Sequence, residues 1–168
     1  KTLNFRKTAG AGTWFVLGVT ACDQPVLFPS SDESFGIPDC WGSGAVVYAA
    51  MEGIAGVKDT GRGMDKVLIA PRWAVSDSKK ASVCVKIPNC QGYVRYEWSI
   101  DGDVMNVDLA ATAAGKRFEL LLPRGRKVQS FTVNGADSEI EIKEIESSKY
   151  LVADLKEICA YTVTVTLE

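Results

Sequence analysis

Histidine is absent from all 168 residues of this sequence. Ser-His-Asp and Cys-His catalytic arrangements, and acid–base catalysis by histidine, are therefore excluded within this chain. The five cysteines contain no CxxC pair, and a zinc site without histidine would need unusual ligand spacings. We therefore expect no metal and no cofactor, and mostly reduced, buried thiols. Any catalysis here would have to rely on carboxylates or lysine.

An excess of charge of one sign is also lacking, since 19 basic and 21 acidic residues give a net charge of −2. A nucleic-acid partner is not expected from this balance. The longest apolar stretch, within 45–57, is interrupted by Glu52 and by glycines, so no membrane-spanning segment is expected. The first residue is Lys1 and no leader peptide is visible, which suggests that a signal peptide or a larger upstream part has been removed.

Alternating polar and apolar residues dominate the sequence from residue 66 onward. In "GYVRYEWSI" (92–100), Val94, Tyr96, Trp98 and Ile100 fall on one face of a strand, which indicates that this face is buried. Asp101-Gly102 and Asn134-Gly135 predict two-residue hairpin turns whose central residues both have positive φ. The fold class predicted is mainly β: an antiparallel β-sandwich with one packed α-helix.

A single domain is expected over 1–168, because 46% hydrophobic residues suffice for one core. Within it, 1–42 would hold N-terminal strands and an acidic loop, 43–57 a helix, and 66–168 the main antiparallel strands. The helix prediction depends on apolar residues at helical spacing, with Ser43 as a cap and Gly56 at the end. The charged stretch "EIEIKEIESSK" (139–149) is typical of a solvated edge strand.

An ordered series of motifs resembles a known family. The series runs through "DCWGSGAVVYAAMEGIAGV" (39–57), "DKVLIAPRW" (65–73), "GYVRYEWSIDGDVMNVDLAA" (92–111), "FELLLPRGRKVQSFTVNG" (118–135) and "YTVTVTL" (161–167). It resembles the C-terminal region of glycoside hydrolases and phosphorylases built on an α/α six-hairpin barrel, with the α-L-rhamnosidase-like enzymes as the nearest comparison. The resemblance implies that a last barrel helix leads into a β-sandwich, and that the catalytic carboxylates lie mostly in the barrel.

The acidic loop before the helix is the first candidate for contact with a sugar. It supplies Asp32, Glu33 and Asp39, and Trp41 could stack on a sugar ring. A glycosidase needs two carboxyl groups facing each other across a bond, whereas Asp32 and Glu33 are neighbours in the chain. The alternative is that Asp32 and Asp39 cap turns and the start of the helix.

Two aromatic residues are further candidates for binding a carbohydrate. Tyr96 and Trp98 share a strand face with Val94 and Ile100, so they are expected in the core. Trp73 and Tyr93 are expected to be more exposed and could form a flat platform for a pyranose.

The leading hypothesis is therefore a non-catalytic, accessory C-terminal sandwich of a glycoside hydrolase, with an upstream catalytic domain and a carbohydrate as partners. It favours a secreted or periplasmic protein, although the sequence itself does not determine the compartment. The alternatives are a free-standing carbohydrate-binding module and a structural or adhesion sandwich without a ligand.

Overall fold

The structure, a computed structural model, describes residues 41–86, 91–156 and 160–168. The chain forms two compact units, Lys1–Val47 and Tyr48–Glu168. The strands and acidic loop predicted for 1–42 lie outside the described residues, apart from Trp41 and Gly42, which begin the first helix.

The predicted helix is present, but its limits and its geometry differ from the expectation. An α-helix, α1 (Trp41–Tyr48), continues into a π-helical turn, η1 (Ala49–Ile54). Ser43, expected at the cap, is the third residue of α1. The wider turn is closed by a hydrogen bond from the Ala55 N–H to the Ala50 carbonyl, 3.0 Å long. Apolar spacing predicts a helix here, but it does not distinguish the two helical geometries.

Gly56 ends the helical segment, as the sequence predicts. Its φ is +68°, and a Cβ atom at this position would lie 1.7 Å from the carbonyl oxygen of Ala70. The Ala70 N–H donates to the Gly56 carbonyl at 2.7 Å, so the two backbones must approach closely. Only glycine permits both this conformation and this approach.

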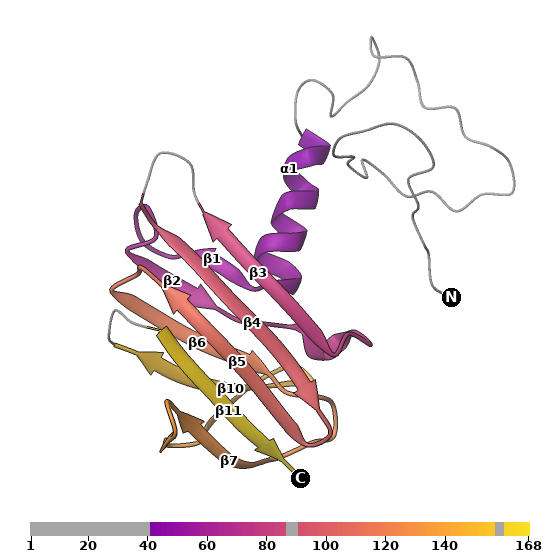
Figure 1. Cartoon of the computed structure of the whole chain (residues 1–168). Helices are drawn as coiled ribbons and strands as arrows, with labels where there is room; N and C mark the ends of the chain where they lie inside the picture. The colour runs from indigo at the N-terminus through magenta and orange to yellow at the C-terminus, as the bar shows by residue number, and fades with distance from the viewer. Residues whose placement is uncertain (1–40, 87–90, 157–159) are drawn as a thin grey trace, which may run out of the picture. The chain divides into compact units, whose positions relative to one another are not determined.

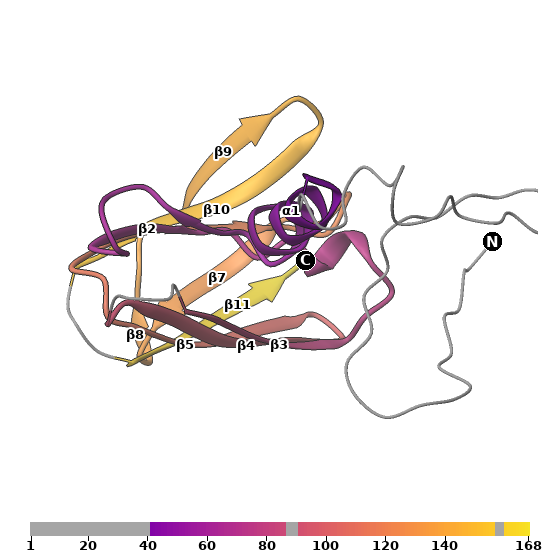
Figure 2. The same cartoon turned by 90° about the horizontal axis from the view of Figure 1, so that it is seen from above.

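The described residues after the helix form two sheets, which Figure 2 shows as two layers. Sheet A has five strands in the order β1 (Val57–Asp59), β2 (Lys66–Ile69), β6 (Gly115–Leu121), β10 (Ser148–Leu155), β9 (Glu141–Ile145). Sheet B has six strands in the order β3 (Lys80–Lys86), β4 (Tyr93–Asp101), β5 (Val104–Ala111), β11 (Ala160–Leu167), β7 (Val128–Val133), β8 (Ala136–Asp137). The predicted β-sandwich is thereby confirmed, and Figure 1 shows how its strands are arranged.

One pairing departs from the antiparallel pattern: β2 pairs with β6 in parallel, with Ile69 opposite Phe118. The chain passes through β3, β4 and β5 of the other sheet between these two strands. Parallel strands require such a crossover connection, because a short hairpin can only join antiparallel neighbours.

Both predicted hairpin turns are present, but the central residues of one of them are shifted by one position. Asn134 and Gly135 have φ values of 53° and 77° and join β7 to β8, as predicted. In the β4–β5 hairpin Asp101 pairs with Val104, so the central residues are Gly102 and Asp103 rather than Asp101 and Gly102. Of these two, Gly102 alone has positive φ, which suits the first central position of a type II′ turn.

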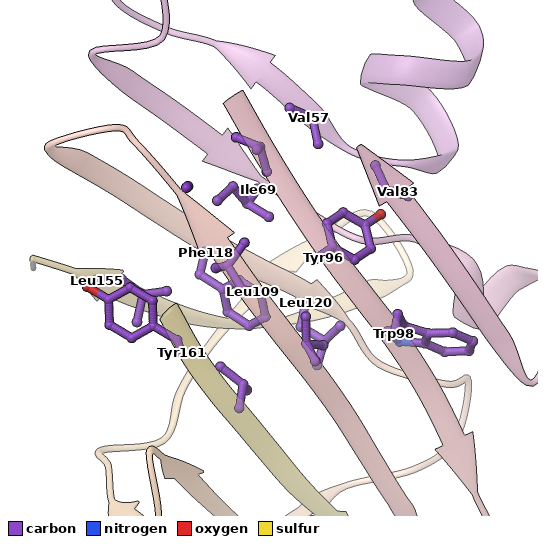
Figure 3. Close-up of a cluster of buried hydrophobic side chains, with 14 of the residues drawn as sticks. Val57, Ile69, Val83, Tyr96, Trp98, Leu109, Phe118, Leu120, Leu155 and Tyr161 are labelled. Atoms are coloured by element: carbon purple, nitrogen blue, oxygen red, sulfur yellow. The ribbon is translucent and has the colours of Figure 1, made fainter. Parts of the chain in front are cut away.

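The core lies between the two sheets and takes side chains from both, as Figure 3 shows. Tyr96 is 0% exposed and Trp98 is 1% exposed, which confirms the prediction that both pack in the core. Phe118 and Leu120 face them from sheet A and are also fully buried. Burial of large apolar side chains of this kind provides most of the free energy that holds two sheets together.

The outer face of sheet A carries a network of charges. Arg117 lies 3.1 Å from Asp154, 3.5 Å from Glu119 and 3.6 Å from Glu141. Lys143 adds a contact to Glu119 at 3.2 Å. β9 is the edge strand of this sheet and all its residues are exposed, which confirms the prediction of a solvated edge for this stretch. Charges on an edge strand oppose pairing with other chains.

Candidate functional site

The predicted site residues fall into two groups. Asp32, Glu33 and Asp39 lie outside the described residues, so their role as sugar ligands or as caps stays a prediction. Trp41 is the first residue of α1. Within the described ranges, no group of three or more Asp, Glu or Cys side chains is arranged to hold a metal ion.

Trp73 lies in a short 3-10 turn, η2 (Trp73–Val75), and is half-buried. Its indole N–H donates to the hydroxyl of Tyr96 at 2.8 Å. That hydroxyl in turn donates to the carbonyl of Ala55 at 2.6 Å, just after η1 ends. The indole of Trp73 therefore connects a surface turn to the core and to the end of the helical segment.

Burial raises the pKa of Tyr96 from 10.0 to about 12, against the opposing effects of the Trp73 hydrogen bond and the charge of Arg72. The neutral phenol is favoured because a buried phenolate would lose its hydration. A neutral hydroxyl can accept one hydrogen bond and donate another, which is the arrangement observed.

Tyr93 lies at the start of β4 and is 37% exposed. Tyr93 and Tyr96 are three residues apart in one strand, so their side chains point to opposite faces of sheet B. Because Trp73 bonds to Tyr96 on the inner face, the structure does not bring Trp73 and Tyr93 together into one platform.

Arg72 connects the end of the helical segment to the sandwich, a role that the sequence alone did not reveal. Its Nη1 donates to the carbonyls of Glu52 and Gly53, both at 2.7 Å, and its backbone N–H donates to the carbonyl of Ile54 at 3.1 Å. These carbonyls belong to the last turn of η1, where helical partners run out. A cation at this end also complements the helix dipole. The visible signal was the arginine in "APRW" (70–73), but carbonyl partners leave no pattern in a sequence.

We call Arg72, Trp73 and Tyr96 the junction cluster. Arg72 donates to the carbonyls of Glu52 and Gly53, and Tyr96 donates to that of Ala55 while accepting from Trp73. These bonds fix the end of the helical segment to the sandwich. At this end Met51 packs against the core, and Val57 is 0% exposed. The expectation of a packed helix is thus met at its C-terminal end.

The preceding part of the helical segment is different. Val46 is 48% exposed, Val47 58% and Tyr48 61%. Successive side chains of an α-helix point about 100° apart, so this exposed apolar surface extends around the segment. Exposed apolar surface of this kind is suited to packing against another protein surface. The expectation that the apolar residues of the helix are packed is not met for Val46 and Val47.

Cys84 is a free cysteine, in line with the expectation of reduced thiols, but it is exposed on β3 rather than buried. It occupies an outward position of the strand, between the inward Val83 and Val85. The remaining four cysteines lie outside the described residues. As for membranes, the described residues include no helix with the length and hydrophobicity needed to cross one.

Comparisons with known proteins agree with the fold. No family model matches the chain, and no curated protein matches it. Among solved structures, the chain is similar to the alpha-L-rhamnosidase from Dictyoglumus thermophilum, with a TM-score of 0.51 and 21% sequence identity. The match covers 76% of this chain and 14% of that chain. The chain therefore shares its fold with a small part of a glycoside hydrolase, in agreement with the resemblance of its motifs.

Proposed function

We propose that this chain is an accessory β-sandwich of a glycoside hydrolase, which packs through its helical segment against a helical catalytic domain. The observation that carries the proposal is the exposure of Val46, Val47 and Tyr48 on a segment whose C-terminal end is fixed by the junction cluster. The similarity to a part of an alpha-L-rhamnosidase supports it, because such a part lies within a much longer enzyme.

The junction cluster gives this lobe a mechanical role. Arg72 binds carbonyls of the last turn of η1, and Tyr96 binds the carbonyl of Ala55 just after it, so a load on the helical segment is transmitted to the core through short, partly buried hydrogen bonds. The lobe would thereby support the position of the helix that the catalytic domain packs against. Catalysis itself would be performed by carboxylates of that domain.

Hydrogen exchange tests the packing directly. We call the longer enzyme that the proposal implies, with this chain as one of its domains, the native gene product. The amides of 43–50 should exchange slowly in it and much faster in the isolated 168-residue chain, because a helix packed against a second domain opens less often. Equal exchange in the two preparations would contradict the proposal.

A substitution at the same surface provides the second measurement. Val47→Glu should lower the stability of the native product by about 1–3 kcal/mol, since it buries a charge in an apolar contact, and change the isolated chain by no more than about 0.5 kcal/mol. The matched control is Ile145→Glu on β9, which is 44% exposed and should have little effect in either protein.

The acidic loop extends the proposal to the glycan site. We retain Asp32, Glu33, Asp39 and Trp41 as candidate contacts at the rim of the catalytic cleft, with Tyr93 and Trp73 as weaker candidates. Replacing the three acids by their amides in the native product should raise KM for the glycoside and leave its thermal midpoint unchanged. A lower thermal midpoint with an unchanged KM would instead assign these carboxylates to capping.

A further inference from the structure

Three segments of the sandwich line an open cleft of about 550 Å3. They are the η2 turn, the loop that follows β6 and the turn that leads into β10, and we call the space between them the basic cleft. Two backbone hydrogen bonds join these segments: Leu122 N–H to the Lys149 carbonyl at 2.9 Å, and Leu121 N–H to the Pro71 carbonyl at 3.2 Å. The backbone of the three segments is therefore held together by main-chain hydrogen bonds.

The lining of the basic cleft is strongly positive, although the whole chain has a net charge of −2. Arg124, Arg126, Lys127 and Lys149 line it, and no acidic residue is among the lining side chains. Arg126 is engaged, because it pairs with Asp103 and donates to the Glu168 carbonyl at 3.2 Å. The other three form no ion pair within the described residues and are exposed.

The rest of the lining favours a small, partly apolar anion. The hydroxyls of Ser147 and Ser148 can donate hydrogen bonds to an oxyanion, while Val75, Leu122 and Pro123 provide apolar walls. The volume is typical of a small-molecule pocket. No aromatic side chain lines the cleft, so stacking of a neutral sugar ring has no platform there, and charge must supply the affinity.

We propose that the basic cleft binds the carboxylate of an acidic saccharide, with Arg124 and Lys149 as its principal ligands. Arginine and lysine form strong, charge-assisted hydrogen bonds to a carboxylate, and an uncompensated positive cleft attracts such a group from solution. The saccharide class rests on the proposed function of this chain in a glycoside hydrolase.

Calorimetric titration of the full 168-residue chain tests the site, with a galacturonic acid trimer as the probe. Binding of the acidic trimer is expected at 20 mM salt, and it should weaken by about tenfold at 200 mM because salt screens exposed charges. The neutral galactose trimer should not bind. Equal binding of the acidic and neutral trimers would overturn the proposal.

Two double variants distinguish binding in this cleft from unspecific attraction to positive charge elsewhere on the surface. Arg124→Gln with Lys149→Gln should weaken binding by about tenfold or more, since both charge-assisted contacts are lost. Lys80→Gln with Lys86→Gln removes the same charge from exposed positions on β3 and should leave binding unchanged. Equal losses in the two variants would show unspecific attraction and overturn the proposal. Circular dichroism of both variants shows whether the fold is intact.

Competition by inorganic phosphate shows whether the cleft is a site for an acidic saccharide or for a free oxyanion. Phosphate should compete only weakly, because it cannot use the apolar walls, and competition as strong as that of the trimer would overturn the saccharide assignment. Absence of trimer binding, combined with slow exchange of 43–50 in the native product, would reject the cleft and leave the accessory role in place. Fast exchange combined with trimer binding would reject the accessory role and leave the anion site.

Discussion

Tyr96 is fully buried, yet it is a polar residue on which two segments depend. Its hydroxyl accepts from Trp73 and donates to Ala55, so replacing it by phenylalanine leaves both partners without this bond. An unpaired buried polar group costs about 1–3 kcal/mol. The same burial couples the stability of the fold to pH.

The direction of this coupling follows from the pKa of Tyr96, which is about 12 in the folded protein and 10.0 in its ordinary state. The contribution is fully present below pH 10 and is lost as the pH rises towards 12, because the unfolded chain releases its proton first. A shift of this size amounts to about 2–3 kcal/mol. Urea unfolding at pH 9 and pH 11.5 should therefore show a larger loss for the wild type than for Tyr96→Phe.

Tyr93→Phe is the matched control for this measurement, because Tyr93 lies in the same strand and is 37% exposed. It should keep the pH dependence of the wild type. Identical slopes for the wild type and Tyr96→Phe would show that Tyr96 does not cause the loss.

The sequence predicts the burial of some single residues correctly, but not their bonding partners. Alternation along β4 placed Tyr96 and Trp98 in the core correctly, since a strand has two faces and one of them must be buried. It could not reveal that Trp73 would bond to Tyr96, a residue 23 positions away. General tendency predicts mostly buried thiols, whereas the position of Cys84 in its strand directs it outward.

At the scale of elements, the last turn of η1 depends on Arg72. Arg72→Gln should lower the free energy of unfolding by about 1–3 kcal/mol, since two charge-assisted hydrogen bonds to carbonyls are lost. Hydrogen exchange of the amides of 49–55 should accelerate in the same variant. These two measurements together report on the attachment of the helical segment.

Arg95→Gln is the control for Arg72→Gln. Arg95 pairs with Glu97 at 3.1 Å on the outer face of sheet B, and both side chains are more than half exposed. Exposed pairs contribute at most about 1 kcal/mol, so this variant should be close to the wild type and should leave 49–55 unchanged. A similar acceleration in both variants would contradict the role of Arg72.

The two hairpins differ in what determines their turn: the turn residues themselves in one, and the register of the flanking strands in the other. Asn134-Gly135 has the expected turn because both residues tolerate positive φ, and the turn is decided by its own residues. The β4–β5 turn is shifted by one residue, because the alternation of buried side chains on both strands fixes the register. At Glu146, with φ of 55°, a non-glycine residue takes a left-handed conformation that no residue-level preference predicts.

For the whole molecule, the layered β architecture was predictable because the central strands, such as β4 and β11, show their buried face as alternation in their own sequence. The division into sheets was not, since β2 pairs with β6 across three strands that belong to the other sheet. The same limit applies to the candidate site: single residues suggested aromatic platforms and acids, while the junction cluster and the basic cleft arise from segments that meet only after folding.

The position of β11 has a consequence for the order of folding. Among the described strands β11 comes last in sequence, yet it lies in the middle of sheet B between β5 and β7. During synthesis β3, β4 and β5 can pair early. The β7–β8 hairpin cannot join them until residues 160–167, which form β11 between β5 and β7, leave the ribosome. Closure of the sheet must then follow translation of this strand, and the long separation of the partners in sequence makes that step slow. Until then the nascent chain would expose the inner face of an incomplete sandwich to chaperones.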